Sequence, residues 1–494
     1  MWRAGQAIFA LQFAGLLVLS WHLWHRFDLT SDFATFYQAW SQIASGDLNP
    51  HLTIFPYNYP NYGYPFWQSH FELLMWPLAL LWWVGQSGFT LLVVQDLALS
   101  AACLVALRWG LELIEEYWPA RGAPVAVAPA LLVILVVNPW TYWTAAFDFH
   151  FQPIAVLAVL LAGRDFWAGR RRGWWWLAAV LACGDVAATY AVALGLSLLL
   201  SGRARARTGL VVVVVALAWL ALIALLGSGK GSTVPYSYGY LARHPVGTGI
   251  GATLAIVWGV VTHPSLPAHT VWSRRHELAR FLAATGYLGT LSTVGIAMAV
   301  VVFGANALNA SANFVGTDAA FQNLAPVMFS AVGLVAVCTW LVRRPAGRPI
   351  VVVACVLVVA QALYLSVVWT PRVRTFFQVP PAAASALAEV KRRIPATAQV
   401  VVSQGVIGRF GGRRFAYPFL DSFPDGQTVP VRVRDVVFVF TDWGIESATS
   451  TQTAAAVSYV RNVLRGEVVL DADGVTALRW SAPPGRSSVT LPKG

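Results

Sequence analysis

The sequence predicts an α-helical polytopic membrane protein with a small α/β domain at its C-terminus. Of its 494 residues, 57% are hydrophobic and only 11% are charged, whereas soluble domains carry about 25% charged residues. Long apolar runs alternate with short connectors in which Arg clusters, as in cytoplasmic loops. The net charge of +12 therefore indicates orientation in a lipid bilayer, and we infer no nucleic acid partner. We expect a multi-pass protein of the cell membrane.

The N-terminal part predicts one span and a long outer loop. Residues 4–24 follow Arg3 and end without a small-residue cleavage site, so we expect an uncleaved helix with its N-terminus in the cytoplasm. Residues 25–70 then form the first extracytoplasmic loop. Within it, residues 33–45 have the apolar spacing of an amphipathic helix lying on the membrane.

The middle of the chain predicts further membrane helices, about 11–13 in all. Residues 71–86 are short and contain Pro77, which favours a re-entrant or interfacial segment. Residues 174–201 carry Gly184 and Asp185 at their centre and predict a hairpin of two half-length helices. Full spans are expected at 89–108, 124–140, 151–163, 209–227, 324–341 and 349–370.

Two points of the topology stay open. Residues 228–304 either include a crossing at 246–262 followed by one span at 281–304, or lie outside up to 279 and continue as a hairpin broken near Gly289. The basic cluster at Arg170–Arg172 is expected in the cytoplasm, although the opposite parity would put it outside.

The composition changes after residue 370. We therefore expect a transmembrane domain at 1–370 and a soluble extracytoplasmic α/β domain at 371–494. The residue patterns of this C-terminal domain predict helices at 381–393 and 452–464, and strands at 398–403, 435–440 and 474–480.

Two carboxylates follow the first span at a spacing of four residues, Asp28 and Asp32. A carboxylate at the mouth of a helix bundle is a candidate general base, because the site is wet but sheltered. The alternative is that one of them caps a surface helix, since Ser31-Asp32 precedes a helical pattern.

Other polar residues lie at the predicted membrane surface. His70 and the pair Asp148 and His150 are candidate ligands of a divalent cation, or simply interfacial hydrogen-bonding groups. Asp185 and Asp96 are intramembrane acids and therefore candidate functional residues. Asp185 is expected to line protein or water, and the alternative for Asp96, in the middle of a span, is simple pairing with a buried polar group. Arg372, just after the last span, is a candidate for binding a lipid phosphate or for anchoring the helix.

These residues fall in blocks that resemble the domain of unknown function 2079 family of polytopic membrane proteins. The family pattern Asp-Leu-Gly-x-Phe-Asp-Gln-x-x-Trp is similar to residues 32–40, which include Asp32, Gln38 and Trp40. Further blocks are similar to Ser69-His70-Phe71, Phe147-Asp148-Phe149-His150, Gly184-Asp185 and Arg393-Ile394-Pro395. The chain departs from the family at three acidic positions, where Tyr37, Gln152 and Gly184 stand.

This family in turn resembles the GT-C glycosyltransferases, which implies a GT-C-like fold and an inverting sugar transfer. The resemblance implies a polyprenyl-phosphate sugar donor and a glycan, lipid or protein acceptor of the cell envelope. Asp32 would be the base, with Asp28 and His70 beside it in the catalytic set. The implied substrate-binding residues are Asp148, His150, Asp185, Gln38, Trp40 and Arg372.

Two other functions remain open at this point. A transporter or lipid flippase would use Asp96 and Asp185 along its path. A non-catalytic membrane protein would instead bind a partner through residues 371–494.

Overall fold

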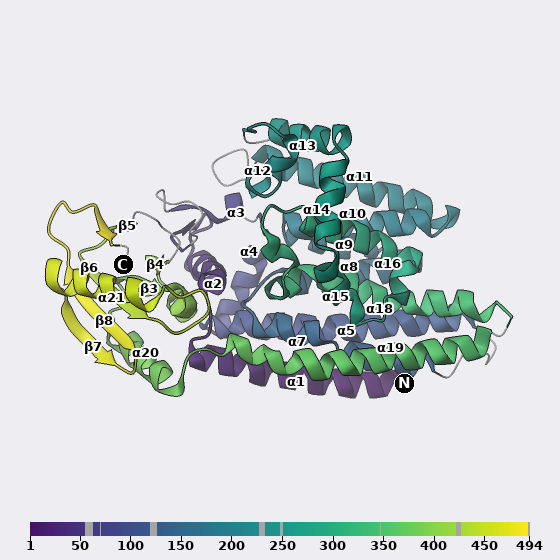
Figure 1. Ribbon diagram of the computed structural model, residues 1–494, viewed down its shortest axis with the longest axis horizontal. Helices are drawn as coiled ribbons and strands as arrows, with labels where there is room; N and C mark the ends of the chain where they lie inside the picture. Colours follow the sequence, from purple (N-terminus) through teal and green to yellow (C-terminus); the bar gives the residue numbers. More distant parts are fainter. Residues whose placement is uncertain are drawn as a thin grey trace.

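The computed structural model describes residues 1–54, 63–69, 71–118, 126–226, 233–247, 250–345, 347–420 and 426–492. The molecule is elongated, and a helical bundle continues at one end into a module of strands and helices (Figure 1). The N-terminus lies at the end of the bundle away from this module. The predicted fold class, a helical membrane protein with a small C-terminal sheet domain, is confirmed.

Long apolar helices build the bundle. Within the described residues, six segments are long and apolar enough to cross a membrane, and the pair α13 (Ile250–Thr262) and α14 (Ser265–Ser273), bent by 89°, would make a seventh. The six are α1 (Trp2–Arg26), α5 (Phe89–Tyr117), α6 with α7 (Val127–Val136 and Pro139–Ala146), α11 (Arg203–Leu226), Thr317–Val342 with α18 (Ala320–Val342), and Gly347–Phe376 with α19 (Gly347–Trp369).

The expected 11–13 membrane helices exceed this number because several predicted segments form shorter helices. The predicted hairpin is confirmed as α9 (Gly173–Ala182) and α10 (Asp185–Leu200), joined at Gly184 with a φ of 104°. Only glycine adopts such a backbone freely. The predicted span at 151–163 is α8 (Gln152–Trp167), with 16 residues. The predicted re-entrant segment contains only α4 (Met75–Leu78) and η2 (Ala79–Trp83).

The open region before α18 is interrupted. Helix α15 (Arg275–Ala283) ends before the short helix η4 (Leu288–Leu291), and α16 (Thr293–Met298) follows. The interruption agrees with the break predicted near Gly289 rather than with one continuous span. A Cβ on Gly289 would lie 1.7 Å from the carbonyl oxygen of Ser330, so the close crossing against α18 requires glycine there.

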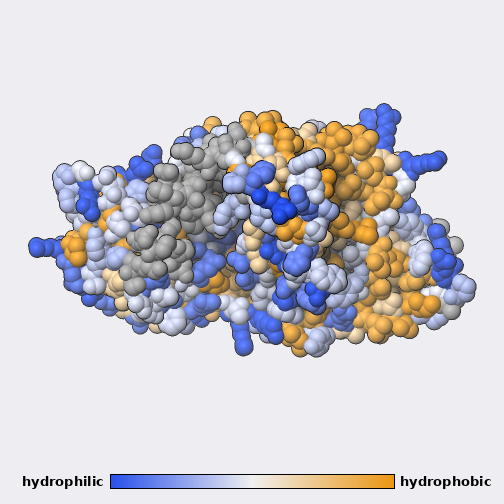
Figure 2. Space-filling view, turned by 45° about the horizontal axis from the view of Figure 1, so that its top comes forward, coloured by the Kyte–Doolittle hydropathy of each residue, from blue (hydrophilic) through white to orange (hydrophobic). Residues whose placement is uncertain are grey.

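Charged side chains of α5 and α8 gather near the N-terminal end of α1. Arg164 pairs with Glu112 at 2.6 Å, and the guanidinium of Arg108 stands over the ring of Trp2. Figure 2 shows apolar side chains concentrated over the helical part, while the module is largely polar. A membrane-embedded bundle between two polar ends accounts for this distribution. Which end faces the cytoplasm stays a prediction.

The C-terminal module contains a five-stranded sheet of order β4-β3-β6-β8-β7. Three neighbouring strands are parallel, namely β4 (Ala416–Phe419), β3 (Gln399–Ser403) and β6 (Asp435–Thr441). Strands β8 (Val475–Ser481) and β7 (Glu467–Ala472) complete it in antiparallel fashion, and β5 (Gln427–Pro430) pairs separately with β9 (Ser488–Leu491). The three predicted strands are confirmed as β3, β6 and β8, and the predicted helices as α20 (Pro381–Arg393) and α21 (Ser450–Ser458).

Helix α2 (Ser31–Ala44) joins the bundle to the module. The sequence predicts a helix lying on the membrane, but the structure buries it, with Phe33 and Trp40 fully covered. The module approaches through the backbone of Gly408, whose N–H donates to the carbonyl of Leu29 at 2.8 Å. The prediction of a lipid-facing helix is therefore wrong, because the amphipathic pattern does not distinguish lipid from a second protein layer.

Candidate functional site

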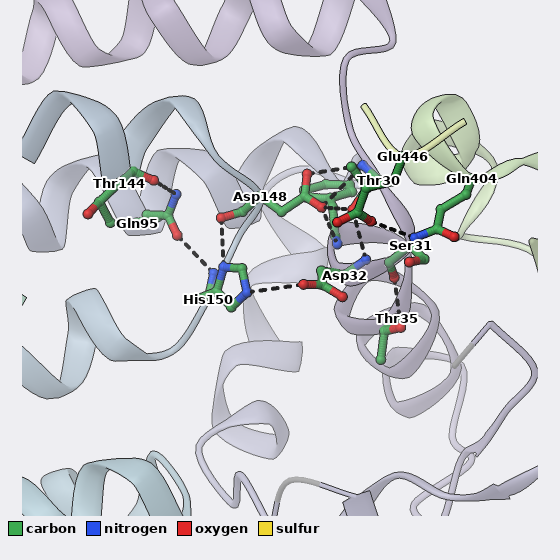
Figure 3. A network of polar contacts seen from close by, with 11 residues as sticks. Thr30, Ser31, Asp32, Thr35, Gln95, Thr144, Asp148, His150, Gln404 and Glu446 are labelled. Atoms are coloured by element: carbon green, nitrogen blue, oxygen red, sulfur yellow. Dashed lines mark hydrogen bonds and ion pairs between the residues drawn. The ribbon is translucent and has the colours of Figure 1, made fainter. Parts of the chain in front are cut away.

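The N-terminus of α2 is held by Asp148, which comes from the turn between α7 and α8. The backbone N–H groups of Thr30 and Phe33 donate to the Asp148 carboxylate, each at 3.1 Å. The Thr30 hydroxyl also donates to it. An anion is favourable here because the first N–H groups of a helix lack partners within the helix. Figure 3 shows this contact between segments far apart in the sequence.

Thr30 is the N-cap of α2, so Asp32 is not. The Thr30 hydroxyl oxygen accepts from the backbone N–H of Asp32 at 3.2 Å, and the helix begins at Ser31. The interpretation of Asp32 as a capping residue is therefore wrong. Its carboxylate is left free of that role and is 44% exposed.

The Asp32 carboxylate faces His150. Its Oδ2 lies 3.7 Å from His150 Nε2, and the His150 side chain is only 8% exposed. His150 Nδ1 lies 3.0 Å from the backbone carbonyl of Asp148, an acceptor, so Nδ1 carries the hydrogen. The backbone N–H of His150 donates to Gln95 Oε1 at 2.8 Å. These bonds turn Nε2 toward Asp32 (Figure 3).

Aromatic rings fix the imidazole from the sides. The ring of Phe321 stacks on His150 with centroids 3.7 Å apart, and Phe147 stacks at 5.5 Å. Phe36 contacts the same ring edge-on at 5.9 Å. The imidazole is thus fixed, while the carboxylate of Asp32 in front of it is reached by water.

The module contributes Glu446 to this site. Gln404 Nε2 donates to Glu446 Oε2 at 2.6 Å. Partial desolvation where the module meets the bundle raises the pKa of Glu446 to about 7, although part of the residue still reaches solvent, and the nearby charges of Asp32 and Asp148 raise it further. Burial raises the pKa of Asp148 to about 6, with the Asp32 charge as the second cause. These carboxyl groups are therefore close enough to share one electrostatic environment.

Asp28 occupies a different position from Asp32. Its Oδ1 accepts the backbone N–H groups of Gln378 and Val379, both at 2.9 Å. Burial raises the pKa of Asp28 to about 7. Asp28 therefore links the first loop by hydrogen bonds to the segment that enters the module.

Gln38 and Trp40 are buried on α2. The Gln38 amide donates to Thr53 Oγ1 at 2.8 Å and to the carbonyl of Arg413 at 3.0 Å, and Trp40 Nε1 donates to the carbonyl of Leu78 at 2.8 Å. These contacts position α2 between the two layers. Substrate binding by either residue stays a prediction.

Three further candidates lie elsewhere or outside the described residues. Asp185 begins α10, accepts the N–H of Val186 at 2.8 Å and lies near Glu72. Arg372 is exposed, with its guanidinium 4.4 Å from the centre of the Trp369 ring. His70 lies outside the described residues.

The predicted cation site does not fit Asp148. Its two oxygens already accept the N–H groups and the hydroxyl that begin α2. Among the residues described, no three His, Cys, Asp or Glu side chains are grouped so that they could hold a metal ion. We therefore derive no step through a metal.

Sequence reasoning missed Glu446, Gln404, Thr30 and Phe321. A signal existed for two of them, because Gln404 and Glu446 follow the predicted strands 398–403 and 435–440. Polar residues after parallel strands are ligand-binding candidates. No local signal indicated that this strand edge would face α2.

A comparison with family models identifies the family of this chain. The model of the family described as predicted membrane protein DUF2079 matches residues 27–440. The chain belongs to this family. None of the curated proteins matches it. Among solved structures, the crystal structure of ArnT from Cupriavidus metallidurans in the apo state is similar with a TM-score of 0.41 and 13% identity, covering 95% of this chain and 97% of that one.

Proposed function

We propose that this DUF2079 protein is a GT-C-like membrane glycosyltransferase. It transfers a sugar from a polyprenyl-phosphate donor to an extracytoplasmic acceptor of the cell envelope, and Asp32 is the general base. The observation that carries the proposal is the pair Asp32 and His150. The Asp32 carboxylate is exposed to water, does not cap α2, and lies 3.7 Å from the imidazole of His150, which is held in place by its neighbours. The pair lies where the helical bundle meets the module.

In this reaction Asp32 accepts the proton of an acceptor hydroxyl. The hydroxyl oxygen forms a bond to the anomeric carbon, and the bond from that carbon to the phosphate oxygen breaks with its electron pair on the phosphate. The configuration at the anomeric carbon is inverted. His150 faces the Asp32 carboxylate with Nε2, and the imidazolium form donates from Nε2 to that carboxylate and stabilises its charge.

Arg372 is the candidate for holding the donor phosphate. Arg372 and Arg280 both stand over the ring of Trp369, at 4.4 and 5.2 Å from its centre. Trp369 ends helix α19, which is long and apolar enough to cross a membrane. Guanidinium groups at that level suit a lipid phosphate.

The test measures release of polyprenyl phosphate from labelled polyprenyl-phosphate sugars by the purified protein in liposomes. Asp32→Asn should lower the rate by a factor of about 10² to 10⁴, the usual contribution of a general base, and should leave donor binding within about threefold, which is a small free-energy change. Asp47→Asn, an exposed acid nearby on the same segment, is the matched control and should be neutral. Unchanged release of polyprenyl phosphate by Asp32→Asn would show that Asp32 is not the general base.

The transporter and flippase hypotheses predict that substitutions at Asp96 and Asp185 have the largest effect. Asp96 is fully buried on α5 beside Ser20, and Asp185 lies near Glu72. If labelled lipid crosses the bilayer without cleavage, and Asp96→Asn or Asp185→Asn stops this movement, the transferase proposal fails in favour of transport.

A further inference from the structure

The parallel strands of the module end at the junction with the bundle. Strands β3 and β6 are parallel neighbours, paired from Gln399 with Val436 to Val402 with Val439. From β3 the chain moves to β4 on one side, and it later returns to β6 on the other side. Open α/β sheets bind their ligands at the carboxyl ends of such a pair, where the connections diverge.

Two glycines bring the loops after these strands together. A Cβ on Gly405 would lie 2.4 Å from the carbonyl oxygen of Ile445, and one on Gly444 would lie 2.6 Å from that of Gly405. Gly444 also has a φ of 97°, which favours glycine. This close crossing places Gln404, after β3, beside Glu446, after β6.

The pair is directed toward α2. Gln404 donates to one oxygen of Glu446, which leaves the other carboxylate oxygen able to accept from a ligand. The side chain of Glu446 is exposed, and its electrostatic neighbours are Asp32 and Asp148 of the bundle together with Asp318. Figure 3 shows Glu446 and Gln404 entering the site from the module.

We propose that Glu446 and Gln404 form the acceptor subsite and bind an uncharged, hydroxyl-rich molecule of the carbohydrate class. This inference rests on the proposed transferase function and names its second substrate. The acceptor lies between the carboxyl ends of β3 and β6 and the first turn of α2. One of its hydroxyl groups donates to Glu446, and the attacking hydroxyl is presented to Asp32.

The charge at this junction selects the acceptor class. Asp32, Asp148 and Asp318, together with the partly ionised Glu446, give the junction a negative potential. An anionic ligand such as a uronic acid would be repelled, whereas neutral hydroxyl groups donate to carboxylates without that cost. The amide of Gln404 adds both a donor and an acceptor.

Binding can be measured on the wild-type protein without any transfer reaction. Carbodiimide-coupled labelling of Glu446 is followed by mass spectrometry in the full-length protein. Neutral methyl glycosides at millimolar concentration should slow the labelling at least fivefold, and methyl glucuronide, an anionic counterpart, should not. Absence of protection by the neutral glycosides, or equal protection by the glucuronide, would overturn the inference.

Variants add a second readout. Gln404→Ala should raise the glycoside concentration needed to protect Glu446 at least tenfold. Glu467→Gln, which removes a carboxylate from the exposed strand β7 of the same module, should not change it. Protection that is unchanged in Gln404→Ala contradicts the subsite.

The two proposals fail in different ways. If Asp32→Asn abolishes donor cleavage while no glycoside protects Glu446, the acceptor subsite is wrong and the transferase remains. If glycosides protect Glu446 while Asp32→Asn cleaves the donor normally, the subsite stands as a carbohydrate-binding site and the assigned base is wrong.

Discussion

Replacing Asp28 by Asn should remove a pH-dependent loss of stability. Burial raises the Asp28 pKa from 3.8 to about 7, the two backbone N–H bonds and the Arg26 charge opposing it. Between these two values the folded protein holds a proton that the unfolded chain has released, so the free energy of unfolding falls as the pH rises. At about 1.4 kcal/mol per pKa unit the whole fall is about 4 kcal/mol.

Most of that change lies in an accessible pH range. Between pH 5 and pH 8 the expected loss from Asp28 is about 3 kcal/mol, because the titration continues up to the folded pKa. Asn at this position keeps an oxygen for the N–H groups of Gln378 and Val379 and does not titrate. The variant should therefore lose about 3 kcal/mol less than the wild type over this range.

The assay is a denaturant titration in detergent micelles at pH 5 and pH 8. The difference between wild type and Asp28→Asn cancels the other titrating groups, and Asp47→Asn serves as an exposed control. Hydrogen exchange of the segment at 376–380 measures the same hydrogen bonds locally, because amides of this segment donate to Asp28. Equal pH dependence in wild type and Asp28→Asn would refute the assigned environment.

Two further substitutions test how the site is held. Thr30→Val removes the cap of α2 and a bond to Asp148, and should cost about 2–3 kcal/mol in unfolding free energy. Gly408→Ala places a Cβ 2.3 Å from the Cβ of Leu29; it should cost about 1–3 kcal/mol and increase hydrogen exchange in α2. Gly15→Ala, with no atom within 4 Å of the added carbon, should leave that exchange unchanged.

The threonine substitution has its own control. Thr375→Val removes an exposed hydroxyl that donates to the carbonyl of Arg372. It should change the unfolding free energy by less than about 0.5 kcal/mol, as exposed substitutions usually do. A similar loss in Thr30→Val and Thr375→Val would contradict the role given to the cap.

The sequence predicted elements well where a local pattern decides the structure. The helix at 381–393 starts with Pro381 and ends in basic residues, and the structure has α20 at those positions. The strands predicted at 398–403 and 435–440 contain the apolar runs 400–402 and 436–440, as parallel buried strands usually do. The hairpin turn was predictable from Gly184, whose φ is 104°.

The site was only partly predictable, because its contacts cross the chain. Asp148 and His150 were candidates from their spacing, yet nothing local indicates that Asp148 would hold the first turn of α2. In the same turn Thr30 is the N-cap of α2, and the side chain of Asp32 stays exposed. Glu446 depends on the docking of the module through Gly408 and on the crossing of two glycine loops, which are tertiary features.

The most direct test of the central claim is a cryo-electron microscopy structure of Asp32→Asn with a polyprenyl-phosphate sugar bound. We predict density for the sugar beside residue 32, His150 and Glu446, with its phosphate on the side of Arg372. We also predict that the anomeric carbon is reachable by an acceptor hydroxyl placed beside residue 32. Donor density confined to another face of the bundle, with none beside these three residues at saturating lipid, would contradict the account.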